Sequence, residues 1–387
     1  MTNSSRILEN NEKISQLIEL IRKKTNPIEK KGDYIVRVID YDGSIIKEER
    51  LNTGDEFVLP NSPEHDNLIF EEWVSPVNIV DNKIIVGDEP ICIGPIYKTI
   101  SGLSEFDIEL MAESQLAVPF YMNGTKYWGD GTSDDLYEHT YAAPGKYTIK
   151  CDGTSFSSSM NNGIFNGVSR CVEARFANIY ELPYRAFYTI SSLKRVSLSK
   201  SFGYFNNNCF YQCYALGCVI VPNGVTGVSN GFIESCTSLK NIVIPKTITK
   251  MSNAPFRNCT LIEFYNIPQS VNCTGTYFVS GNNALKSFKI PTSETTSLPN
   301  YFFDNCSSLE SLKIPKNITS INNCFNSCRS LSFIDMSEFD EPPTVHISAF
   351  NNVYPQMKIL VKDEVTLEKF RTATNWAPQA FRMRVKE

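Results

Sequence analysis

The sequence predicts a multidomain, mainly β protein whose C-terminal half is a solenoid of stacked repeats. Three observations lead to this fold class. A motif recurs about every 23 residues through the second half of the chain, β-type segments with turn signals fill residues 28–100 and 103–152, and an apolar heptad pattern opens the chain. One such repeat cannot bury its apolar face alone, whereas stacked repeats bury a continuous core.

The composition of the 387 residues is that of a globular protein. Hydrophobic residues make up 42% and charged residues 20%, and the formal net charge is −5. No apolar stretch approaches the roughly 18 residues of a membrane span, and the net charge argues against a chain built to neutralise nucleic-acid phosphates. The first residues form no continuous apolar segment, so no secretory signal is expected at Met1. We therefore expect neither a membrane span nor a nucleic-acid partner.

Residues 1–26 carry the pattern of an amphipathic helix that ends before Pro27. A helix of about 20 residues cannot bury its apolar stripe alone, so it needs a partner surface. The stripe packs either on its own chain or in a dimer, a trimer or a docking contact. The candidate oligomerisation or docking residues are Ile7, Ile14, Leu17, Ile18 and Ile21.

Residues 28–100 alternate as strands do and contain a hairpin turn at Asp42-Gly43. The order of landmarks along this segment is Tyr34, Asp40-Tyr41-Asp42-Gly43, Gly54, Pro60, Phe70, Trp73 and Ile96-Tyr97. This order resembles the InlB B-repeat-like β-grasp module, also called the Listeria–Bacteroides repeat. The resemblance implies a small spacer or adhesive module of a surface protein, without catalytic activity.

Residues 103–152 hold three spaced sequence pieces around aromatic residues: Tyr127-Trp128-Gly129-Asp130-Gly131, His139-Thr140-Tyr141 and Gly145-Lys146-Tyr147. Together they resemble the β-sandwich of polycystic-kidney-disease-type (PKD-like) domains, with Trp128 and Tyr141 in the core. Asp130, Asp134 and Asp135 share one polar loop, which either forms a solvated turn or supplies oxygen ligands to calcium.

Residues 153–353 contain the repeats. Ile-Pro or Val-Pro pairs begin at residues 221, 244, 267, 290 and 314, and each is preceded by a strand segment. Five cysteines recur once per repeat: Cys213, Cys236, Cys259, Cys306 and Cys328. We expect a ladder of buried reduced thiols, because no second Cys or His recurs beside each one to build a metal site. In the fifth repeat Gly281 or Asn282 replaces the Cys, and a bulge is expected there.

The repeat pattern Phe-x-x-Cys-x-x-Leu, followed by an apolar strand and Pro, closely resembles BspA-type leucine-rich repeats over more than 180 residues. Residues 354–387 resemble the strand-helix-strand cap that closes such solenoids. The resemblance implies surface proteins of bacteria, protists and phages that bind other macromolecules and share no catalytic residue.

In this register the side chains between the inward positions face the concave sheet. The candidate binding residues on that face are Arg195, Ile220, Asn241, Val243, Phe264, Asn266, Lys289, Lys313 and Phe333. Ile220, Val243 and Phe264 form an apolar strip at its centre, which is either ordinary surface or a contact patch. If it is a contact patch, a charge at Phe264 should abolish binding without unfolding the protein.

No HExxH, GxSxG, GxGxxG or P-loop motif stands out, so neither an enzyme nor a cofactor is expected. Modules in series predict a rod with an anchoring end and a presenting end. We expect a structural or adhesive bacteriophage component, a fibre or decoration protein of the virion assembled in the host cytoplasm. Its N-terminal helix would bind a capsid or tail protein, and its repeats would bind a host surface glycan or protein, or a neighbouring fibre. The alternatives are a bacterial cell-surface adhesin and a carbohydrate-active enzyme.

Overall fold

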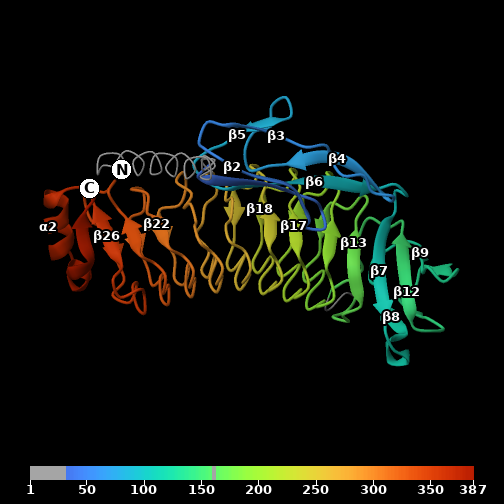
Figure 1. The fold of residues 1–387 in the computed structure, drawn as a ribbon. Coiled ribbons are helices and arrows are strands. Elements are labelled where there is room, and N and C mark those ends of the chain that lie inside the picture. The colour runs from blue at the N-terminus through green and yellow to red at the C-terminus, as the bar shows by residue number, and fades with distance from the viewer. Residues whose placement is uncertain (1–31, 159–162) are drawn as a thin grey trace, which may run out of the picture.

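The computed structural model describes residues 32–158 and 163–387, and the helix expected at residues 1–26 lies outside these ranges. Three parts follow one another along the chain: an N-terminal module (residues 32–100), a capping segment (residues 103–158) and the solenoid (residues 163–387). Figure 1 shows the solenoid as a row of coils, with the capping strands at one end and α2 at the other. Within the described residues, no helix is long and apolar enough to cross a membrane.

The N-terminal module is a mixed sheet with a small hairpin beside it. Its strands are β1 (Tyr34–Ile39), β2 (Ile45–Leu51), β4 (Leu68–Val74) and β6 (Ile91–Thr99), in the order β2-β1-β6-β4, with β3 (Glu56–Val58) paired to β5 (Lys83–Ile85). β1 runs parallel to β6 and antiparallel to β2. The predicted Asp42-Gly43 turn is confirmed, since Gly43 has a φ of +85° and the Asp42 carboxylate accepts the Ser44 N–H at 2.8 Å.

The capping segment is not a separate body, because it shares a sheet and a hydrophobic core with the solenoid. Its elements are β7 (Ser104–Leu110), η1 (Glu113–Gln115), β8 (Ala117–Pro119), β9 (Lys126–Tyr127), β10 (Ser133–Asp134), β11 (Glu138–Thr140) and β12 (Gly145–Cys151). β7 pairs antiparallel with β13 (Cys171–Arg175), the first repeat strand, and β13 pairs parallel with β15 (Arg195–Ser197). The segment therefore covers the open end of the repeat core and shares that core.

Trp128 and Tyr141 are buried in the capping segment as predicted, and the Tyr141 hydroxyl donates to the Trp128 carbonyl at 2.8 Å. The Asp130 side chain makes its hydrogen bonds with residues of its own loop and of β11. The Asp130 carboxylate accepts from Thr132 and lies 2.8 Å from His139 Nε2. Among the described residues no group of three acidic, His or Cys side chains could hold a metal ion. The contacts of Asp130 with Thr132 and His139 hold the loop in a turn.

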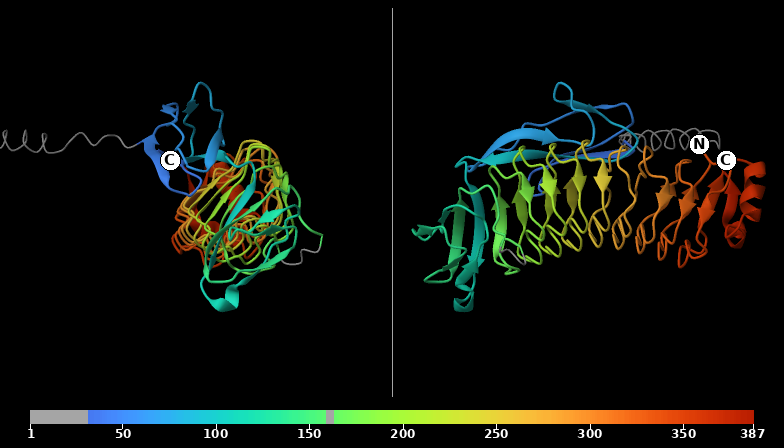
Figure 2. Two further views of the ribbon diagram at one scale, coloured as in Figure 1. Left: turned by 90° about the vertical axis from the view of Figure 1, so that its right-hand side faces the viewer. Right: turned by 180° about the vertical axis from the view of Figure 1, so that it is seen from behind.

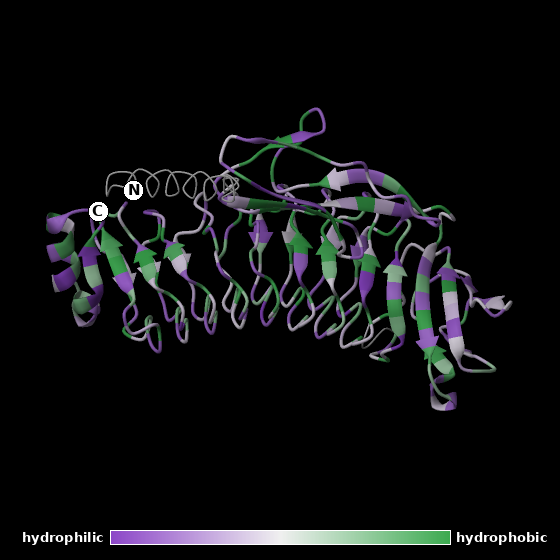
Figure 3. Cartoon of the chain, in the orientation of Figure 1, coloured by the Kyte–Doolittle hydropathy of each residue, from purple (hydrophilic) through white to green (hydrophobic). Residues whose placement is uncertain are grey.

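The solenoid coils pair through short parallel strands. The main sheet is built from three hydrogen-bonded groups of strands in succession. The first ends in β13 and β15, the second is β17 (Cys218–Ile220) and β19 (Asn241–Val243), and the third is β22 (Ser311–Lys313), β24 (Phe333–Asp335), β26 (Lys358–Val361) and β27 (Met383–Val385). A second face carries β14 (Glu181–Leu182), β16 (Tyr204–Phe205), β18 (Gly227–Val228), β20 (Lys250–Met251), β21 (Ser297–Leu298), β23 (Ser320–Ile321) and β25 (Thr344–Val345). Hydrophobic segments recur from coil to coil in Figure 3.

Phenylalanine rings and thiols line up inside the coils, which confirms the repeat interpretation. Phe303 and Phe325 stack at 5.6 Å between ring centroids with an interplanar angle of 5°. All twelve cysteines are free and buried. Each ladder thiol lies near a backbone carbonyl of the preceding coil; Cys213 Sγ, for example, donates to Phe187 O at 3.1 Å. Burial raises the pKa of Cys259 and Cys328 to about 12, so both stay protonated and unreactive at neutral pH.

Asn282 takes the place of the ladder thiol in the fifth repeat without a bulge, so the expected bulge is wrong. Its amide donates to Phe256 O at 2.9 Å, the same kind of contact that the thiols make with the preceding coil. Gly281 has a φ of 75°, in the same left-handed region as Asn258 and Asn305 at the equivalent positions. The turn therefore keeps its shape because the amide replaces the thiol as donor.

We predict that Asn282→Cys stabilises the protein by about 1 kcal/mol, because Asn282 Oδ1 is buried without a hydrogen-bond partner and a thiol would remove that atom. The free energy of unfolding in urea measures the change. Cys306→Asn is the reciprocal control and should destabilise. Equal stability of all three proteins would contradict this account of the ladder.

The main sheet is interrupted at two coils, residues 264–266 and 287–289, which carry no strand. Their inward residues are Tyr265 and Phe288, whereas the neighbouring coils have Ile242 and Leu312 at this position. Two large rings in successive coils need more room than aliphatic side chains, so the backbones lose their ladder pairing. The break lies between β19 and β22.

The chain ends in the predicted strand-helix-strand cap. β26 is followed by α2 (Glu364–Thr372), then by η2 (Ala377–Arg382) and β27. The Asp363 carboxylate accepts the Thr366 N–H at 2.8 Å and so caps the start of α2. Trp376 is buried, and its indole N–H donates to Pro343 O at 2.7 Å. The cap closes the last coil.

The modules do not follow one another as a rod. The N-terminal module folds back and lies along the main sheet of the solenoid, as Figure 2 shows from two sides. β6 packs against β15, β17 and β19. The in-line arrangement expected from the sequence is therefore wrong for this module.

Candidate binding site

The candidate site is on the outer face of the main sheet, called here the sheet face. It consists of the outward side chains at the first and third positions of each three-residue strand segment. The N-terminal module covers the half of this face nearest the capping segment. Within residues 32–158 and 163–387, no part of the module covers the half nearest the C-terminal cap, called here the open half. The sheet break lies at the boundary between the two halves.

The covered half contains the apolar strip. Cys218, Ile220 and Val243 pack in one cluster with module residues Ile39, Val74, Cys92 and Ile96. Ile220 is 6% exposed and Val243 is fully buried, so the expectation that they face water is wrong. A Cβ on Gly94 of β6 would lie 2.6 Å from Ile220 Cδ1 and 3.1 Å from Val243 Cγ2. The glycine thus lets β6 lie directly on the strip.

Polar contacts complete the covered surface. The guanidinium of Arg37 donates to Asn241 Oδ1 at 2.8 Å and lies 5.5 Å from the centroid of the Phe264 ring. Asn266 accepts the Cys92 N–H at 2.8 Å and donates to the Pro90 carbonyl. Phe264 therefore contacts the chain's own module, and a charge placed there would disturb that contact.

A buried ion network joins the module, the capping segment and the first coils. Arg175 lies 2.7 Å from Asp107, 2.8 Å from Glu173 and 3.3 Å from Glu105. Arg195 pairs with Glu173 at 2.5 Å, and the hydroxyl of Tyr41 in the module donates to Glu173 at 3.1 Å. Arg195, predicted as a binding residue, therefore forms an ion pair within this network.

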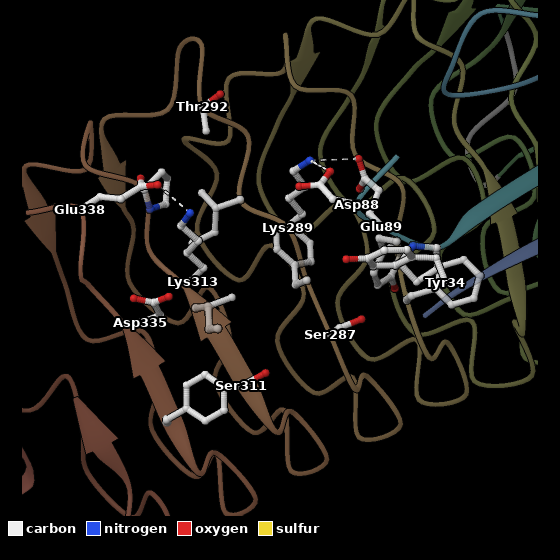
Figure 4. A pocket seen from close by; sticks show the side chains of 18 residues that line it. Tyr34, Asp88, Glu89, Ser287, Lys289, Thr292, Ser311, Lys313, Asp335 and Glu338 are labelled. Carbon is white, nitrogen blue, oxygen red and sulfur yellow. Dashed lines mark hydrogen bonds and ion pairs between the residues drawn. The ribbon is translucent and has the colours of Figure 1, made fainter. Parts of the chain in front are cut away.

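A groove of about 440 Å³ lies where the edge of the module meets the open half of the sheet face. Figure 4 shows module residues on one side and side chains of successive coils on the other. The module contributes Tyr34, Asp88, Glu89 and Pro90, and the coils contribute Phe264, Ser287, Lys289, Ser311, Lys313, Phe333, Asp335 and Glu338 among others. Its volume falls in the range of ligand-binding pockets.

Charged side chains in the groove are held in pairs. Lys289 bonds Asp88 and lies 3.7 Å from Glu89, and Lys313 pairs with Glu338 at 2.6 Å (Figure 4). The hydrogen bond from Lys289 lowers the pKa of Asp88. Burial against the solenoid raises the pKa of Glu89 from 4.5 to about 7, despite the nearby Lys289.

Comparison with known proteins identifies the repeats. The family model for BspA type leucine rich repeat regions matches six copies, over residues 150–263 and 228–358, which together span more than half of the chain. The chain belongs to this family. The matched residues cover the segment in which the 23-residue spacing predicted leucine-rich repeats.

Solved structures of repeat proteins are similar to part of the chain. A leucine-rich repeat protein from Bacteroides ovatus matches 49% of this chain and 60% of its own, with 15% identity and a TM-score of 0.38. A leucine rich cell surface protein from Faecalibacterium prausnitzii matches 48% of this chain and 58% of its own, with 20% identity and a TM-score of 0.34. A search of curated proteins finds no match.

The predicted site residues divide at the sheet break of the BspA-type repeats. Arg195, Ile220, Asn241, Val243 and Asn266 lie under or against the module, and Lys289, Lys313 and Phe333 line the groove. Phe264 does both, since it contacts Arg37 of the module and also lines the groove. Sequence reasoning missed Tyr34, Asp88 and Glu89, because nothing local shows that they approach coils about 200 residues away. The candidate docking residues of the N-terminal helix lie outside the described residues.

We predict that the stability of the BspA-type protein falls as pH rises from about 4.5 to about 7, through the carboxyl of Glu89. The pKa of this group is higher in the folded state than in the unfolded chain. Its contribution is therefore fully present below the unfolded value of 4.5 and is lost as pH rises through about 7. Urea unfolding across this range measures the slope.

Glu89→Gln should flatten this part of the profile and leave the variant more stable than the native protein above pH 7. Glu341→Gln is the matched control, because Glu341 is mostly exposed and does not line the groove. An unchanged slope in Glu89→Gln would show that other groups set the pH dependence.

Proposed function

We propose that the protein is a non-catalytic binding protein that uses the open half of the sheet face, together with the edge of the N-terminal module, to contact a macromolecule. The observation that carries this proposal is the groove at their junction. It is lined by two separate parts of the chain and contains Phe333, an aromatic residue that is 39% exposed. Exposed aromatic side chains in concave surfaces are frequent anchors of partners.

The groove chemistry supports binding rather than hydrolysis. Glycoside hydrolysis needs two carboxylates free to act as acid and base or nucleophile. Here Asp88 and Glu338 are tied to lysines, and Asp335 pairs with Lys386 at 2.7 Å, which leaves Glu89 as a single carboxyl without a second to complete the pair. These ion pairs connect neighbouring side chains along the groove and occupy the carboxylates that hydrolysis would need.

The proposal also concerns where the protein acts, on a phage particle or on a bacterial cell surface. The resemblance of the repeats implies a surface protein, either a component of a phage particle or a bacterial adhesin. The particle assignment depends on residues 1–26, which lie outside the described ranges. Mass spectrometry of purified particles, with cross-links from residues 1–26 to capsid or tail proteins, would separate the two settings.

We predict that Phe333→Asp abolishes binding to immobilised surface polymers while the protein stays folded, because the Phe333 side chain points out of the core at the open face. Whole cells, cell-wall polymers and host matrix proteins serve as the panel, and the melting temperature verifies folding. Phe381→Asp is the control, since Phe381 is 63% exposed in η2, outside the groove. Binding that survives Phe333→Asp would place the contact elsewhere.

A further inference from the structure

The groove is mostly apolar, with two serine hydroxyls placed between aromatic side chains. Phe264 and Phe333 occupy the same strand position three coils apart, and Ser287 and Ser311 occupy that position in the two coils between them. Small hydroxyl side chains in between leave the space that forms the floor of the groove.

The lining offers little unpaired charge to an ionic ligand. Lys289 is bonded to Asp88 and lies near Glu89, Lys313 pairs with Glu338, and Asp335 pairs with Lys386. Each pair places a donor beside an acceptor at a fixed position. A ligand with hydroxyl groups, which both donate and accept, matches such alternating partners without needing a charge of its own.

From these features we propose that the groove binds a neutral oligosaccharide, with a sugar ring against Phe333 and its hydroxyl groups toward the paired lysines, carboxylates and serines. This inference rests on the proposed function and names its ligand class. The apolar C–H face of a pyranose packs on an aromatic ring, while its edge stays available for hydrogen bonds. The apolar and aromatic lining offers the first surface, and Ser287, Ser311 and the ion pairs offer the hydrogen-bond partners.

Three other ligand classes fit less well. An extended peptide gains its main-chain hydrogen bonds from an exposed sheet edge, whereas this groove lies on a sheet face. An apolar ligand would leave Ser287, Ser311 and the ion pairs desolvated without partners. A highly charged polymer would have to compete with the existing ion pairs.

The test measures binding of the full chain to neutral gluco-, manno- and galacto-oligosaccharides by titration calorimetry and ligand-observed NMR. An oligouronate, a lysine peptide and a glutamate peptide are the charged comparisons. We expect at least one neutral series to bind, with little change in affinity when salt is raised, because no net charge is neutralised. Phe333→Ala should weaken this binding about tenfold or more, and Phe381→Ala should leave it unchanged.

Binding of charged probes alone, or neutral binding that is insensitive to Phe333→Ala, would overturn the glycan assignment. So would the absence of binding to every neutral series. These outcomes differ from failure of the proposed function. If the glycans do not bind but a protein or charged polymer binds in a Phe333-dependent way, the groove is still the contact surface and only its ligand class is wrong.

Discussion

Replacing Ile220 by Asp is expected to release the N-terminal module from the solenoid while the repeats stay folded. Ile220 points away from the repeat core into the cluster shared with Ile39, Val74 and Ile96. A carboxylate there would lose water without gaining a partner, at a cost of about 3–5 kcal/mol. The substitution therefore weakens the contact between module and solenoid and not the repeat core, since the inward side chains of the coil are unchanged.

Thiol accessibility makes the release measurable. Cys92 and Cys218 are buried by the contact between module and solenoid, whereas Cys236 and Cys259 are buried inside the coils. In the Ile220→Asp variant, a thiol reagent followed by mass spectrometry should label Cys92 and Cys218 first. Radius of gyration from small-angle scattering should rise in parallel.

Ile347→Asp is the matched control, because Ile347 is 63% exposed and its replacement should label no thiol. Gly94→Leu should reproduce the release from the module side, since its side chain would meet Ile220 and Val243. Labelling of Cys236 and Cys259 as early as Cys218 would mean that the substitution unfolds the repeats.

The repeats could be predicted from the sequence because their signal is local and periodic. A 23-residue spacing fixes which residues face inward, and Leu312, Phe303 and Cys306 are all buried as that register requires. The register also placed Phe333 and Lys313 on the outer face. The same argument could not place the sheet break, because it depends on how Tyr265 and Phe288 pack in three dimensions.

The docked module was harder to foresee, although two signals for it exist. β6 is an almost uninterrupted apolar run, Ile91–Tyr97, which is typical of a strand covered on both faces. The strip of Ile220 and Val243 is the complementary surface, interpreted from sequence as a site for an external partner. Neither segment specifies the other, because pairing between residues more than 100 positions apart depends on the whole fold.

Arg175→Met is expected to destabilise the junction of capping segment and repeats by about 3–5 kcal/mol. The Arg175 side chain is 4% exposed and sits between Glu105, Asp107 and Glu173. Methionine fills a similar volume but leaves buried carboxylates with less compensation. Hydrogen exchange in β7 and β13, the strands that Arg175 holds together, should accelerate more than exchange in β24.

The loss should depend on pH in a defined direction. Burial by itself would raise the pKa of Asp107, but the hydrogen bonds and charge of Arg175 outweigh burial and lower it. A lowered carboxyl pKa contributes stability above its unfolded value, and this stability is lost as pH falls through the folded value. The difference between native protein and Arg175→Met should therefore be largest near neutral pH and shrink in acid.

Two further variants complete the test. Arg371→Met removes an exposed pair with Glu368 and should cost less than about 1 kcal/mol. Adding Glu105→Gln and Glu173→Gln to Arg175→Met should recover part of the stability, because neutral amides are less costly to bury than unpaired carboxylates. A loss in Arg175→Met no larger than in Arg371→Met would show that the buried network contributes nothing beyond a surface ion pair.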